Sequence, residues 1–118
     1  NELVLNGNYE GLTAAISASH IHSGAAGSNG PVVVNISNTG GTFGVLNASA
    51  TLSDVQETSL LSGNMYVNIH SSSFPGGEIR AQLIAGTSGE TQYSEIVATG
   101  AQEVPANTST AIGSVVVM

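Results

Sequence analysis

A chain of 118 residues with eight acidic residues, one arginine and no lysine carries a formal net charge of −7, and this balance argues against binding to nucleic acids or to anionic membranes. The length fits a single domain, and the absence of cysteine excludes disulfides and thiolate metal sites. Fifteen glycines among many Ser, Thr and Asn residues indicate short strands joined by tight turns, and no apolar run is long enough to span a bilayer.

The first half of the chain shows the period-two alternation that is typical of β-strands. Strands are expected at 3–10, 13–22, 31–37 and 42–52. The small residues of 24–30 predict a loop, and the Asn-Thr-Gly-Gly tract at 38–41 predicts a turn. Three consecutive valines, Val32 to Val34, indicate that the third strand is buried.

One short helix is expected to interrupt the strands. Ser53 is placed as its N-cap, with Gln56 at the third helical position in the pattern of a capping box, and Gly63 ends the helix. Three apolar residues of this segment are expected to dock it: Val55, Leu60 and Leu61.

The second half of the chain again reads as strands, expected at 64–70, 78–85, 91–99 and 109–118, with a loop over 101–107. Alternation places the apolar residues around Val67 on one face, whereas Glu78, Arg80 and Gln82 point outward. Many short strands with a single helix predict an all-β fold, an immunoglobulin-like β-sandwich.

The three histidines of the chain lie on strands of this polar face. His20 and His22 are two apart and share a face, and His70 shares its face with the polar residues of a second strand. Three neutral imidazoles that converge from a sheet face predict a copper or zinc site. The alternative is that these rings only form hydrogen bonds with loop carbonyls.

The two charged residues of the outward face are interpreted as structural. Arg80, the only cation, is expected to bind carboxylates or carbonyls on its sheet face. Glu78 is a candidate fourth metal ligand, although pairing with Arg80 is the favoured interpretation.

Two long motifs, in the right order, resemble the CHRD domain family. The first is His-Ile-His at 20–22 followed by Asn-Gly-Pro-Val-Val-Val at 29–34. The second is Tyr-Val-Asn-Ile-His at 66–70 followed by Pro-Gly-Gly-Glu-Ile-Arg-Ala-Gln-Leu at 75–83. The resemblance implies an extracellular all-β domain.

The order of a third motif departs from the family pattern. Relatives usually open with a strand, then Gly-Ala-Gln-Glu-Val-Pro and a second strand, whereas here this hexapeptide stands at 100–105 and is followed by the apolar residues 112–118. The resemblance therefore implies a domain cut between its second and third strands, with the first two strands placed at the C-terminus.

Three arrangements explain this order: a circular permutation within one domain, donation of the C-terminal strands to the next subunit, or one repeat of a tandem array. The single domain 1–118 is divided accordingly into a body (1–85), a flexible linker (86–90) and C-terminal strands (91–118). The apolar residues expected to complete a sheet by strand exchange are Val97, Ile112, Val115 and Val117.

The first functional hypothesis is a structural subunit of an extracellular filament or surface polymer, in which the chain is its own partner, head to tail. The alternatives are a monomeric secreted module that binds a metal or a protein, and a copper or zinc enzyme of dismutase type. Catalysis is not expected, because the chain has neither a Gly-x-Ser-x-Gly elbow nor a phosphate-binding loop.

Overall fold

The computed structural model describes residues 2–83 and 95–117. Within them the chain is all-β with one short α-helix, as predicted. The strands are β1 (Glu2–Glu10), β2 (Ile16–Ser23), β3 (Val32–Asn35), β4 (Ser37–Asn38), β5 (Gly44–Thr51), β6 (Met65–Ser71), β7 (Ile79–Gln82), β8 (Glu95–Thr99) and β9 (Ile112–Val117). The helix α1 spans Asp54–Leu61, and a short 3-10 helix, η1, spans Gly100–Gln102.

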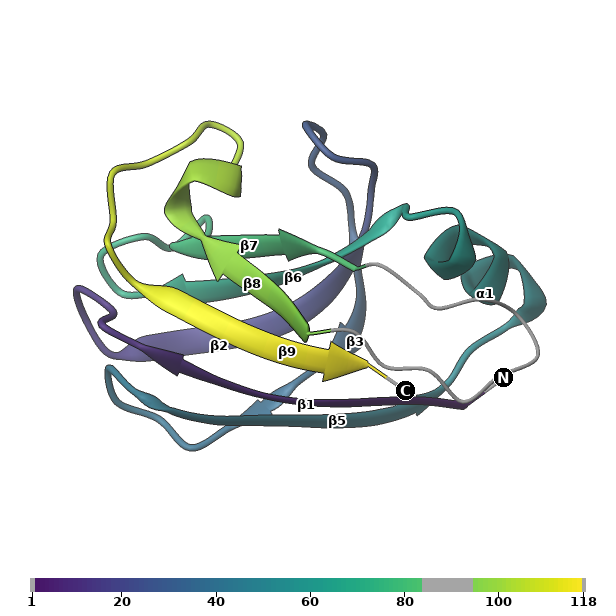
Figure 1. Ribbon diagram of the computed structural model, residues 1–118, viewed down its shortest axis with the longest axis horizontal. Helices are drawn as coiled ribbons and strands as arrows, with labels where there is room; N and C mark the ends of the chain where they lie inside the picture. The colour runs from purple at the N-terminus through teal and green to yellow at the C-terminus, as the bar shows by residue number, and fades with distance from the viewer. Residues whose placement is uncertain (1, 84–94, 118) are drawn as a thin grey trace.

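The strands form one antiparallel sheet in the order β3-β2-β6-β7-β8-β9-β1-β5-β4. The sheet bends over on itself, with β2, β6 and β7 in one half and β9, β1 and β5 in the other (Figure 1). Its two ends meet because Ile36 alone separates β3 from β4, and the Ile36 amide donates to the carbonyl of Ser19 in β2. The result is a nearly closed sandwich.

The core lies between these two halves and consists of alternate residues of the facing strands. Its fully buried aliphatic side chains are Leu3, Leu5, Ile21, Leu46, Met65, Val67, Ile69, Ile79, Ala81, Leu83, Ala98 and Val115. The valine run is less buried than the sequence suggests. Val32 is 49 % exposed because β3 is an end strand with a neighbour on one side only.

The C-terminal strands sit in the middle of the sheet. β8 pairs with β7, and β9 runs between β8 and β1 (Figure 1). Of the four residues expected to complete a sheet, Val115 and Val117 are buried in the core, whereas Val97 and Ile112 are about half exposed on the outer face. The predicted linker at 86–90 lies outside the described residues.

Helix α1 begins with the predicted capping box. The Gln56 amide donates to the Ser53 hydroxyl oxygen, and the Ser53 amide donates to the Gln56 side chain. The predicted docking by three apolar residues is wrong for two of them, because only Leu60 is buried while Val55 and Leu61 are exposed.

Candidate functional site

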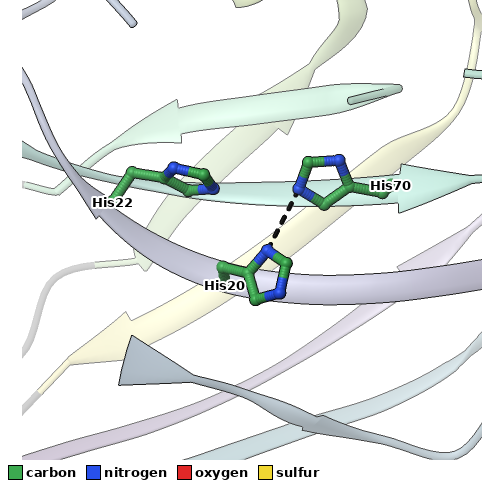
Figure 2. A group of neighbouring side chains, drawn as sticks. All are labelled: His20, His22 and His70. Atoms are coloured by element: carbon green, nitrogen blue, oxygen red, sulfur yellow. Dashed lines mark hydrogen bonds between the residues drawn. The ribbon is translucent and has the colours of Figure 1, made fainter. Parts of the chain in front are cut away.

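Three histidine rings lie together on the face of β2 and β6 that is turned away from the core. His20 and His22 come from β2, and His70 comes from β6 (Figure 2). Each ring offers one nitrogen atom, and these three nitrogen atoms all lie within 4.8 Å of one another. His20 Nδ1 and His70 Nε2 are 3.2 Å apart, close to the separation of about 3.3 Å for two nitrogens on one tetrahedral zinc ion. The three residues could together hold a metal ion.

Hydrogen bonds to backbone carbonyls set the tautomers of two of these rings. His22 Nδ1 donates to the carbonyl of Gly30 and His70 Nδ1 to that of Pro75, each over 2.9 Å. In both rings Nε2 is therefore the unprotonated nitrogen, which carries the lone pair that a metal ion can bind. Within the described residues, His22 Nε2 is buried without a hydrogen-bond partner. His70 Nε2 accepts from His20 Nδ1, which must release this proton to bind a metal through the same atom.

The surroundings of His20 and His70 favour the neutral form of the ring, which is the form that metals bind. Burial lowers the pKa of His20, and the nearby His22 lowers it further. Burial also lowers the pKa of His70, and the hydrogen bond to Pro75, which acts in the opposite direction, does not compensate. The rings of His20 and His70 therefore hold a proton less readily than a free imidazole.

The polar face around these rings is covered, whereas the sequence predicted that it points outward. Arg80 is 1 % exposed because the loop 24–30 lies over it. Its guanidinium donates to the carbonyls of Ala25 and Ser28 and to the Asn29 side chain, over 2.7 to 3.1 Å. Arg80 thus binds loop carbonyls, one of the two kinds of partner expected for it.

Tyr66 connects the histidines to Arg80. The His22 ring stacks on the Tyr66 ring, with centroids 4.9 Å apart, and the Arg80 guanidinium carbon is 3.5 Å from the Tyr66 centroid. The Tyr66 hydroxyl accepts a hydrogen bond from the Gly30 amide. The ring therefore holds the loop in place on the same side as His22.

Glu78 does not pair with Arg80, contrary to the prediction. Its carboxylate accepts hydrogen bonds from the Ser71 hydroxyl at 2.7 Å, from the Ser109 hydroxyl at 2.6 Å and from the amide of Thr13 at 2.9 Å. Burial alone would raise its pKa, but the bonds from these serines and from Thr13 outweigh burial and hold the pKa below its usual value. Glu78 is a structural carboxylate that joins three segments.

The sequence of the CHRD domain matches residues 1–83. The chain belongs to the CHRD domain family. The matched region contains the histidines, the loop 24–30, Glu78 and Arg80, and it ends before the two C-terminal strands. CHRD domains occur in extracellular proteins, and the described residues contain no helix long and apolar enough to cross a membrane. Curated protein sequences and solved structures both gave no match.

Two residues of the chain, one inside the matched region and one beyond it, are not predicted as functional although both lie in the quoted motifs. Asn68 stands two residues before His70, and Glu103 stands in the Gly-Ala-Gln-Glu-Val-Pro segment. Glu103 lines a pocket of about 260 Å³, together with Arg80 and Gln82. Their positions in these motifs are a sequence signal that could have pointed to them. Their burial could not be predicted, because it depends on contacts between segments that are distant in the sequence.

Proposed function

We propose that the chain is a structural subunit of an extracellular polymer in which strands β8 and β9 of one copy complete the sheet of the next. The observation that carries the proposal is the position of these strands between β7 and β1. Without them the sheet opens in its middle, and the backbone groups of β7 and β1 lose their partners. The family match ends before these strands, which supports treating the preceding residues as the body.

The length of the connecting segment supports donation to a neighbour. The eleven residues 84–94 separate the body from β8. Fully extended, such a segment reaches about 36–40 Å, which compares with the 39 Å longest extent of the molecule. A donated pair of strands that does not return to its own body makes a head-to-tail contact, and repetition of this contact gives a fibre.

Two disulfides with one cysteine position in common test strand exchange. Asn8 lies opposite Ser114 of β9 and opposite Val45 of β5, at pair distances that a disulfide can span. Since the chain has no cysteine, no native thiol competes with the intended bond of the variant Asn8→Cys/Ser114→Cys. Donation predicts a ladder of covalent multimers on a denaturing gel without reductant.

The matched control is Asn8→Cys/Val45→Cys, which joins two strands of the body and should give a covalent monomer. A cross-linked monomer from the Asn8/Ser114 variant would show that each chain completes its own sheet. A covalent dimer without larger species would show a closed exchange and overturn the polymer. In either case the second hypothesis, a monomeric or small secreted binding module, would replace the first.

We further propose that His20, His22 and His70 bind copper or zinc within this subunit. The observation that favours it is the buried His22 Nε2, which has no partner among the described residues and is held in place from its Nδ1 side. A metal ion would join β2 to β6 and stiffen the sandwich. The proposal assigns no catalysis to the site.

Elemental analysis of the washed protein tests the metal. The wild-type chain should retain about one ion, and His22→Ala should lose most of it. Glu10→Gln, which removes an exposed carboxylate of β1, is the control for cations held loosely by the acidic surface. If protein incubated with copper or zinc and then washed contains neither metal, the proposed site is overturned. A redox assay on the metal-loaded protein tests the remaining alternative, an enzyme of dismutase type.

A further inference from the structure

The carboxyl group of Glu103 is buried where the segment between β8 and β9 meets the body. Glu103 is 6 % exposed, and its Oε2 has no hydrogen-bond partner within residues 2–83 and 95–117. The Oδ1 of Asn68 on β6 is buried and unpartnered in the same way. Both oxygens lie beside Gly77, since a Cβ built on this glycine would overlap each of them. Two buried acceptors therefore lie close together with no donor for either.

A proton on Glu103 resolves this conflict. The Asn68 amide nitrogen already donates to the carbonyl of Gly76, which leaves Oδ1 on the side of Glu103. A protonated carboxyl group is a donor and can bond to this oxygen, whereas an ionised one can only accept. Leaving two buried acceptors unpaired is costly, and leaving a charged one unpaired costs more.

The charged surroundings of Glu103 include one cation. Arg80 on β7 favours the ionised form, but its guanidinium already donates to the loop 24–30. The other titratable groups near this sheet face are Glu78, directly before β7, His20 and His22 on β2, and Tyr66 and His70 on β6. Burial outweighs the attraction of Arg80 and raises the pKa of Glu103 to about 7.

Neighbouring contacts show that this segment docks through polar groups. The carbonyl of Val104 accepts from the Asn29 side chain at 2.9 Å, and the Asn107 side chain donates to the carbonyl of Glu78 at 3.0 Å. Glu103 directly precedes Val104 in the sequence, and the pocket that it lines gives protons access. Its protonation is thus placed to control how firmly the segment is held.

We infer that Glu103 is a proton-dependent contact that binds residues 95–117 to the body through Asn68, firmly when the carboxyl group is protonated and weakly when it is ionised. The contact acts within one chain or between two. Its role at the joint between subunits rests on the strand exchange proposed above. The partner at that joint is a second copy of this chain.

The direction of the pH effect follows from proton linkage. The docked Glu103 binds its proton with a pKa of about 7, against an ordinary value of 4.5. Between these values the docked state holds a proton that the free segment has lost. Docking is therefore strongest below pH 4.5 as far as Glu103 is concerned, and it weakens as the pH rises to about 7, by up to about two orders of magnitude.

NMR titration of the labelled side-chain carboxyl carbons tests the inference directly on the wild-type chain. Glu103 should titrate near pH 7. A midpoint at or below 4.5 would overturn the inference and would show that the Asn68 amide is reversed, with its nitrogen donating to an ionised Glu103. This measurement does not depend on any variant folding.

Glu103→Gln supplies the second measurement, because the amide can donate to Asn68 at every pH. The unfolding midpoint of the variant should exceed that of wild type by a small amount at pH 5 and by a much larger amount at pH 8. Glu10→Gln removes the same charge from an exposed position and is the matched control. A Glu103→Gln difference that does not change with pH would overturn the inference. The cysteine cross-links report strand exchange separately, so the two proposals can fail independently.

Discussion

Gly76 and Gly77 follow one another in the turn before β7, yet only Gly77 lacks room for a side chain. Gly77 has φ +125°, and a Cβ there would overlap the Asn68 amide and the Glu103 carboxyl group. At Gly76 no described atom lies within 4 Å of the corresponding position. The close approach of the backbone at Gly77 is what brings Asn68 and Glu103 together.

We expect Gly77→Ala to lower the free energy of unfolding by more than about 2 kcal/mol, because it combines backbone strain with a steric overlap. Gly76→Ala, one residue away, should change it by less than about 0.5 kcal/mol. Urea denaturation of both variants is the measurement. Equal effects of the two alanines would contradict the packing described at Gly77.

Glu78→Gln should destabilise the protein by at least about 2 kcal/mol at pH 7, because the new amide cannot accept from Ser71, Ser109 and Thr13 together. The folded-state pKa of Glu78 lies below 4.5. Its contribution is therefore complete above pH 4.5 and is lost as the pH falls through the folded-state value. Denaturation at pH 7 and at pH 3 should show the gap between wild type and variant narrowing; a gap of constant size would refute a stabilising carboxylate.

The sequence predicts that the three histidines lie close together, but it does not predict the hydrogen-bond partners of Glu78. A spacing of two places His20 and His22 on one face by local geometry alone. The hydroxyl groups that bind Glu78 come from segments as far as 65 residues away in the sequence, and no periodic pattern reports such contacts. The sequence therefore predicts the nearby Arg80 as the partner of Glu78, and this prediction is wrong.

At the scale of elements, helix α1 is attached to the sandwich through one side chain. Leu60 is 8 % exposed, whereas Val55 is 77 % exposed on the same helix. Leu60→Ala should lower the free energy of unfolding by about 2–3 kcal/mol, and Val55→Ala by less than about 0.5 kcal/mol. Thermal unfolding followed by circular dichroism would measure both; a larger effect at Val55 would mean that the helix docks on its other face.

The strands were predictable because alternation and turn residues are local signals. Every described strand overlaps an expected one, although the expected strand 31–37 is divided between β3 and β4 and β7 is shorter than its prediction. Local signals of this kind do not predict that the loop 24–30 covers the polar face. The loop 24–30 reads as a solvent-exposed connection, and only the contacts with Arg80 and Tyr66 show that it is packed.

At the scale of the whole molecule, the central position of β9 makes the sheet depend on it. Val115 is fully buried between the two halves, whereas Val97 on β8 is half exposed. Val115→Ala should lower the stability of the whole molecule by about 2 kcal/mol in one cooperative transition, and Val97→Ala should have little effect. Calorimetry would measure both. A separate early transition in Val115→Ala would mean that the C-terminal strands unfold on their own.

The composition and the strand pattern predict the fold class. Only the resemblance to the CHRD domain family indicates that the last two strands take the role of the two strands with which relatives open. Their apolar alternation shows that they need a partner sheet without showing which gap they fill. That gap is defined by β7 and β1, which are distant in the sequence.

The burial of the only arginine has a consequence for digestion of the protein. Trypsin cuts after lysine or arginine, and this chain offers a single such residue, Arg80, which is 1 % exposed within β7. The native protein should therefore resist trypsin until the sandwich opens, and each opened molecule should then be cut once into two fragments. Where cleavage outpaces reclosing, the rate of that single cut equals the rate at which the sandwich opens.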